Sequence, residues 1–222
     1  MNPMTPGVAH RQEAVLATNS LIRNTYILLS LTLLFSAFTA ALSMAFNLPY
    51  PGLVITLVGY FGLLFVTVKL KNSAWGLLSI FALTGFMGLT LGPIISFYLT
   101  QFSNGSELVM MAMGGTAVIF LGLSGYALTT RRDFSFLGGF LFVGFLVVIG
   151  AMLVNIFLHI PALSLALSAV IIMLMSGFIL YDTSRMINGG QTNYVLATIS
   201  LYLSIFNIFI NLLHLLGFAG DD

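Results

Sequence analysis

The sequence predicts an all-α membrane protein with seven transmembrane helices, and two observations carry this prediction. Hydrophobic residues make up 59% of the 222-residue chain and charged residues only 6%, with a mean hydropathy of +1.08. Soluble proteins carry charge on about a quarter of their residues. In addition, seven apolar runs follow one another. Most are near or above the roughly 20 residues that a helix needs to cross a bilayer core of about 30 Å.

The predicted spans are joined by short connections that leave no room for a soluble domain. The first span follows a polar tail over residues 1–25 and is longer than the apolar core of a signal peptide, so we expect it to be retained. Together the spans form one transmembrane domain over residues 26–218, with a short outer tail over 219–222. Their ranges are 26–46, 52–68, 74–100, 108–128, 136–158, 162–187 and 195–216.

Small residues gather on two of the early spans. The first span places five hydroxyl residues on one helix face, and the third has three glycines at helical spacing before Pro93. Small side chains favour close helix packing, which is the interpretation that both patterns favour. A pathway lining in the first span and a loosened backbone near Pro93 are the alternatives. The residues are Thr25, Thr32, Ser36, Thr39, Ser43, Gly85, Gly88 and Gly92.

The basic residues predict the orientation. With seven spans, every Lys and Arg falls on one side of the membrane: in the N-terminal tail, at Lys69 and Lys71, at Arg131 and Arg132, and at Arg185. The positive-inside rule then predicts a cytoplasmic N-terminus and a periplasmic C-terminus. A six-span or eight-span arrangement would break this segregation, so the charges support the count of seven independently.

Composition excludes several classes of function. The chain has no cysteine, which excludes disulfides, thiolate metal sites and a cysteine nucleophile. A net charge of +1 without a basic cluster excludes nucleic acid as a partner. Ser124 lies in a Gly-Leu-Ser-Gly run, but we expect it near the cytoplasmic end of its span and His159 and His214 near the outer ends. The sequence therefore predicts no enzyme, metal site or cofactor.

The candidate gate lies at the end of the sixth span. Asp182 is an ionisable group about 8 Å inside the predicted end of that helix, which makes it a functional hypothesis. The alternative is an interfacial carboxylate paired with Arg185 three residues later. Ser204 on the seventh span reaches a comparable depth and is the expected neighbour of Asp182.

The seventh span carries a polar stripe. Ser200, Ser204, Asn207, Asn211 and His214 lie within an arc of roughly 80° on one helix face. This face cannot point toward lipid, so we expect the seventh helix at the centre of the bundle. The stripe either lines a polar path or forms hydrogen bonds between helices.

Several motifs resemble the signature of the Bax inhibitor family, the transmembrane Bax inhibitor motif proteins. They are Ile179-Leu-Tyr-Asp-Thr183, Gly189-Gly-Gln-Thr-Asn-Tyr194 and the run from Leu201 to Leu213. Other stretches look more narrowly like the bacterial YccA branch: Arg23-Asn-Thr-Tyr26, Leu91-Gly-Pro93 and the run from Leu128 to Gly139. The resemblance covers nearly the whole chain and implies seven helices with the seventh in the middle.

The resemblance implies two functions. The YccA branch is associated with FtsH, an ATP-dependent protease of the bacterial inner membrane, and with its membrane regulators, as substrate and inhibitor. The tail over 1–25 is expected to be disordered and to serve as a handle for the protease, unless it is only a frayed terminus. The alternative is a pH-sensitive calcium or cation leak channel, because similar proteins gate with two aspartates that share a proton. The first matches Asp182, but the second position is Ser204, which has no carboxylate.

Overall fold

The computed structural model describes residues 6–219, with side chains described from residue 16 onward. These residues form seven α-helices joined by short loops, without any strand between residues 6 and 219. The helices are α1 (Pro6–Ala45), α2 (Leu53–Leu70), α3 (Ala74–Gln101), α4 (Gly105–Thr130), α5 (Leu137–Leu158), α6 (Pro161–Ile187) and α7 (Tyr194–Ala219).

All seven helices are long and apolar enough to cross a membrane, α1 over Leu16–Ala45. The predicted fold class is therefore confirmed. The predicted spans differ from the helices by only a few residues at most ends, because loop residues bound each apolar run. Residues 220–222 of the predicted outer tail lie outside the described residues.

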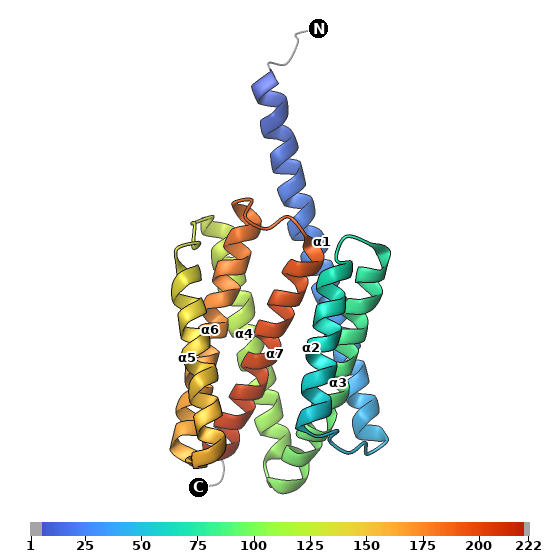
Figure 1. Cartoon of the computed structure of the whole chain (residues 1–222), viewed down its shortest axis with the longest axis vertical. Coiled ribbons are helices and arrows are strands. Elements are labelled where there is room, and N and C mark those ends of the chain that lie inside the picture. Colours follow the sequence, from blue (N-terminus) through green and yellow to red (C-terminus); the bar gives the residue numbers. More distant parts are fainter. Residues whose placement is uncertain (1–5, 220–222) are drawn as a thin grey trace.

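Helix α7 lies at the centre of the bundle, as the polar stripe predicted. It packs against α1, α3, α4 and α6, and Figure 1 shows it crossing between α2 and α3 on one side and α5 and α6 on the other. In the most apolar 18-residue stretch of α7, 56% is buried, whereas the corresponding share is 6% for α2 and 11% for α5. The two peripheral helices leave most of their apolar side chains for the lipid.

The small residues of α1 and α3 pack these two helices together. Thr32, Ser36, Thr39 and Ser43 are all buried, and Thr39 and Ser43 lie beside glycines of α3. A Cβ atom added at Gly88 would overlap the backbone carbonyl oxygen of Ser36 and the hydroxyl of Thr39. The backbones of α1 and α3 approach this closely only because glycine has no side chain. The packing interpretation of both small-residue patterns is therefore supported over a pathway lining.

Pro93 lies inside α3 without ending it. Proline has no N–H, so the carbonyl of Leu89, four residues earlier, loses its partner within the helix. The hydroxyl of Ser43 on α1 donates a hydrogen bond to this carbonyl oxygen at 2.9 Å. A neighbouring helix thus satisfies the group that Pro93 leaves free, as buried backbone in a membrane requires.

Helix α1 extends into the tail over residues 1–25, for which the sequence predicts disorder. The helix already begins at Pro6 and runs without a break into the first span, and Figure 1 shows it extending well beyond the bundle. Proline is favoured at the first helical position, and the alanine, leucine, glutamate and arginine that follow are good helix formers. Residues 1–5 lie outside the described residues.

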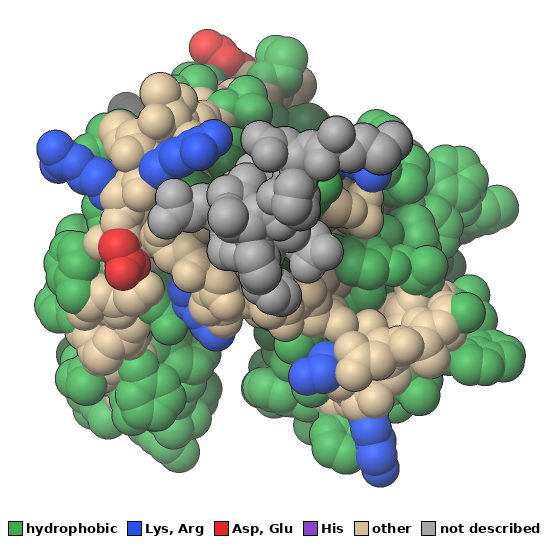
Figure 2. Space-filling view, turned by 90° about the horizontal axis from the view of Figure 1, so that it is seen from above, with side chains coloured by type: hydrophobic (Ala, Val, Ile, Leu, Met, Phe, Trp, Pro, Cys, Tyr) green, Lys and Arg blue, Asp and Glu red, His purple; other side chains and the backbone are tan. Residues whose placement is uncertain are grey.

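The described basic side chains gather at one end of the bundle, which we call the basic end. Lys69 and Lys71 lie at the end of α2, Arg131 and Arg132 follow α4, and Arg185 is in the last turn of α6. Figure 2 looks onto this end and shows Lys and Arg side chains distributed around it. The loops at the other end, which we call the opposite end, carry none.

Candidate functional site

The candidate site forms where α6 and α7 meet at the basic end. Asp182 lies five residues before the end of α6, and Ser200 lies six residues after the start of α7. The two helices run antiparallel through a short loop, so these positions come together. The Ser200 hydroxyl donates a hydrogen bond to Oδ2 of Asp182 at 2.5 Å. Both side chains are half-buried, and a carboxylate in this position gains from a donor that replaces water.

The partner of Asp182 is Ser200, one helical turn before the expected Ser204. The Ser204 hydroxyl is buried and donates instead to the backbone carbonyl of Ser200 at 3.1 Å. The sequence could place both serines on the correct face but could not set the register of α6 against α7. That register depends on the shape of the loop between them, which the sequence pattern does not specify.

Arg185 contributes to the α6–α7 loop. Its guanidinium donates to the carbonyl oxygen of Gly190 at 2.6 Å and lies over the ring of Tyr181, 5.4 Å from the ring centre. Gly189 adopts a φ of 78°, which favours glycine and lets the chain reverse directly after α6. The guanidinium therefore helps close the loop, whereas the sequence analysis considered it as a direct partner of Asp182.

Two residues that the sequence analysis did not single out connect this loop to its neighbours. The Ser184 hydroxyl accepts a hydrogen bond from the Phe134 N–H at 2.8 Å and donates to the Arg132 carbonyl at 3.2 Å. Asn193 donates to Oδ1 of Asn72 at 2.8 Å and accepts from the N–H of Leu196 at 3.0 Å. Asparagine just before an apolar run is an N-cap signal that the sequence contains. For Ser184, no such signal exists.

Asp133 lies outside the spans, in the loop that Ser184 holds. The N–H of Ser135 donates to its carboxylate at 2.8 Å. Hydrogen bonds from the side chain and then the backbone of Ser135 hold the pKa of Asp133 below its ordinary value. Asp133 is therefore a fixed negative charge beside the arginines of the basic end at neutral pH.

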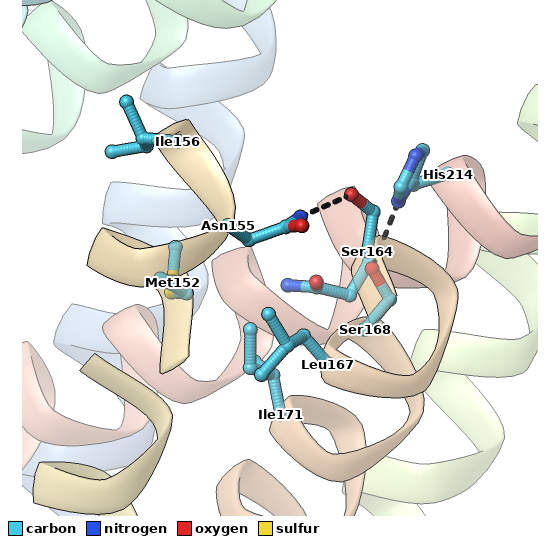
Figure 3. A pocket seen from close by; sticks show the side chains of 9 residues that line it. Met152, Asn155, Ile156, Ser164, Leu167, Ser168, Ile171 and His214 are labelled. Carbon is cyan, nitrogen blue, oxygen red and sulfur yellow. Dashed lines mark hydrogen bonds between the residues drawn. The ribbon is translucent and has the colours of Figure 1, made fainter. Parts of the chain in front are cut away.

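The polar stripe of α7 joins other helices only near its two ends. Ser204, Asn207 and Asn211 each donate to a carbonyl of α7 itself, four residues earlier. Ser200 bonds α6 through Asp182, and His214 bonds α6 through Ser168, with Oγ to Nδ1 at 2.9 Å. Figure 3 shows this second contact beside the bond from Asn155 to Ser164. Ser200 and His214 therefore make the contacts between helices, whereas Ser204, Asn207 and Asn211 bond only their own helix.

The other titratable groups do not form a catalytic or metal site within the described residues. The hydroxyl of Ser124 is buried and has no hydrogen-bond partner there, so no base activates it. His159 ends α5 with a φ of 52°, is exposed, and its ring contacts the Phe157 carbonyl at 3.2 Å. In the described part of the chain, no three His, Cys, Asp or Glu side chains are close enough to share a metal ion. What the arrangement can do is couple α6 to α7 through a single carboxylate.

Comparison with known proteins covers nearly the whole chain. Residues 18–221 match the family described as inhibitor of apoptosis-promoting Bax1. The modulator of FtsH protease YccA from Escherichia coli strain K12 is 53% identical over 214 residues, 96% of this chain and 97% of that protein. The inner membrane protein YccA of E. coli strain CFT073 has the same identity and coverage. An uncharacterized protein of Pseudomonas aeruginosa is 52% identical over 219 residues, 99% of this chain and 96% of the relative.

Proposed function

Because this chain belongs to the Bax inhibitor family, we propose that it is an inner-membrane modulator of an FtsH-type membrane protease, both substrate and inhibitor. The observation that carries this proposal is the 53% identity, along 96% of the chain, with the E. coli protein named as a modulator of that protease. The relative named as an inner membrane protein supports the location. Substrate and inhibitor are compatible roles if the protease engages the chain and releases it slowly.

Two features of the fold support this role. Helix α1 projects beyond the basic end (Figure 1), and its 15 residues from position 6 to 20, before Leu21 packs against the core, extend about 22 Å at 1.5 Å per residue. The loops at the same end are held together through Ser184 and Asn193. We propose that the projecting segment faces the cytoplasm, following the positive-inside rule. A protease would then meet an accessible handle followed by a body that resists extraction.

The handle is tested by deleting residues 2–20 and measuring the half-life of the protein in cells with active protease. We expect the half-life to lengthen, because the protease loses the segment that it engages. Deleting residues 220–222 is the matched control and should leave the half-life unchanged. An unchanged half-life after the first deletion, at equal expression and membrane insertion, would rule out the handle.

Modulation is tested separately from degradation of the protein itself. Purified protease and a second membrane substrate are placed in vesicles, and the rate of substrate loss is measured with and without the full-length protein. We expect a slower rate with the full-length protein and a smaller effect with the 2–20 deletion. A rate that does not respond to the full-length protein would contradict the proposed function.

A second candidate function is a cation leak gated at the basic end. It is supported by one observation, the half-buried Asp182 carboxylate bonded across to Ser200 on the central helix. Calcium flux into vesicles that contain the protein should exceed flux into empty vesicles and should change with Asp182→Asn. Ser200→Asp and Ser204→Asp each add a second carboxylate to α7. Only the variant whose new carboxylate faces Asp182 should make the flux depend on pH, which the structure predicts for Ser200→Asp. Flux equal to that of empty vesicles from pH 5 to 8 would exclude the channel.

A further inference from the structure

A pocket opens at the opposite end of the α6–α7 pair, far from Asp182. It lies where α5 and α7 both pack against α6, and it has a volume of about 290 Å³. The residues that line it lie between about 3 and 15 Å inside the ends of their helices at 1.5 Å per residue. The volume of the pocket is close to the smallest at which proteins commonly hold small ligands. Figure 3 shows side chains of α5 and α6 turned toward the same space as His214.

The pocket combines a polar part with an apolar part. Asn155, Ser164, Ser168, Asn211 and His214 supply amide, hydroxyl and imidazole groups, whereas Leu167 and Ile171 of α6 and Met152 and Ile156 of α5 supply apolar surface. The two α5 residues are also exposed on the lipid-facing side of the bundle, at 46% and 55%. A ligand that enters from the lipid can therefore keep its chain among apolar groups.

Several polar groups of the pocket keep hydrogen-bonding capacity. Asn211 uses an amide hydrogen for the Asn207 carbonyl at 2.8 Å, which leaves its side-chain oxygen able to accept. Asn155 bonds Ser164 with one of its two amide hydrogens. When Nδ1 of His214 accepts from Ser168, Nε2 carries the hydrogen and can donate. With this tautomer of His214, the pocket offers one acceptor and two donors.

The charges near the pocket define the class of ligand. Among the residues that the structure describes, no Lys, Arg, Asp or Glu lines it, and the described basic side chains gather at the basic end. A charged group would lose its hydration here without a partner of opposite charge, which is costly. The ligand expected from this chemistry is uncharged, carries a hydroxyl donor and carbonyl acceptors, and continues into an apolar chain.

We propose that the pocket binds the glycerol ester region of an uncharged acylglycerol from the membrane leaflet at the opposite end of the bundle. The free hydroxyl donates to the side-chain oxygen of Asn211, and an ester carbonyl accepts from Nε2 of His214 or from Asn155. The acyl chain follows Leu167 and Ile171 and leaves between Met152 and Ile156. This site is independent of the proposed protease function and of Asp182.

The test uses the full-length protein in phosphatidylcholine nanodiscs with a diacylglycerol that carries a photoreactive diazirine in one acyl chain. After illumination, labelled residues are identified by mass spectrometry. We expect labelling concentrated on the pocket residues of α5 and α6. Excess unmodified diacylglycerol should compete for this labelling, whereas excess phosphatidylglycerol or a hydrocarbon of equal chain length should not. Competition by the hydrocarbon, or labelling spread evenly over the lipid-facing residues of α2 and α5, would overturn the proposal.

Asn211 and Asn207 provide a matched pair of variants. Both bond a carbonyl of α7 four residues earlier at 2.8 Å, but only Asn211 lines the pocket. Asn211→Leu should reduce labelling of the pocket about tenfold, the effect of one lost hydrogen bond of ordinary strength. Asn207→Leu should leave the labelling unchanged. An equal effect of the two variants would contradict the assignment. If Asn211→Leu does not fold, Ser164→Phe, which fills the pocket, is used in its place and should also reduce the labelling. The competition experiment with the wild-type protein tests the proposal without any variant.

Discussion

The α1–α3 pair and the α6–α7 pair use similar polar residues in opposite ways. In the first, glycines bring the backbones together, and hydroxyls such as those of Thr32 and Thr39 bond carbonyls three residues earlier on their own helix. In the second, Asp182–Ser200 and Ser168–His214 cross from helix to helix near the two ends, and a pocket opens beside the latter. Hydroxyls that bond their own helix leave the close approach of α1 and α3 to glycine, whereas side chains that cross from helix to helix link α6 to α7.

The largest expected effect is at the close approach of α1 and α3. Gly88→Ala should lower the free energy of unfolding by about 3 kcal/mol, because the new Cβ would overlap backbone of α1 that cannot move aside. Gly122→Ala on α4 meets nothing within 4 Å and should change it by less than about 0.5 kcal/mol. Unfolding in detergent micelles measures both. Similar values for the two variants would mean that glycine packing does not hold this pair together.

The next effect compares the two polar contacts of α6 and α7. A double-mutant cycle with Asp182→Asn and Ser200→Ala should give a coupling energy of about 1.5 kcal/mol, because the hydrogen bond is charge-assisted. A cycle with Ser168→Ala and His214→Phe should give about 0.6 kcal/mol, the usual value for neutral pairs between membrane helices. A larger coupling at the second contact would make the opposite end the stronger link.

Ser43 is the α1 hydroxyl that bonds across to α3, so it tests the comparison inside the first pair. Ser43→Ala should cost about 1 kcal/mol, because it leaves the Leu89 carbonyl without a donor. In the background of Pro93→Ala, which restores an N–H to α3, the same change should cost much less. Equal costs in both backgrounds would show that the hydroxyl acts by packing alone.

The smallest expected effect concerns hydroxyls that bond their own helix. Thr32→Val keeps the shape of a fully buried side chain and removes a bond to the Leu29 carbonyl of the same helix. We expect a change below about 0.5 kcal/mol, because that carbonyl also belongs to the helix ladder. The change is read from the same unfolding measurement. A cost near that of Ser43→Ala would remove the distinction between the two kinds of hydroxyl.

Much of the architecture was predictable, because a bilayer permits few solutions. The lengths of the apolar runs and the positions of Lys69, Arg131 and Arg185 led to seven spans with one basic end. The stripe from Ser200 to His214 placed α7 at the centre. These inferences depend on hydrophobicity and helical period, which are local properties of the chain.

The details of the candidate site were less predictable. Ser204 was expected beside Asp182, but Ser200 bonds it, because the α6–α7 loop sets the register. Arg185 was considered as the partner of Asp182, yet its side chain closes the loop at Gly190. The tail over residues 1–25 was expected to be disordered, whereas α1 begins at Pro6 within it. Each difference arises where two segments meet or where helix propensity outweighs polar composition.

The sequence alone determined that this protein has seven membrane-spanning helices, with its basic residues on one side and α7 in the middle, and its motifs resemble those of the Bax inhibitor family. The spans follow from transfer of apolar side chains out of water, and the central place of α7 follows from the period of the helix. Only the tertiary structure decided that Ser200 meets Asp182, that Ser43 satisfies the carbonyl freed by Pro93, and that a pocket opens beside His214. Hydrogen bonds and cavities depend on the relative positions of helices to within about an ångström, and packing of the whole bundle sets those positions.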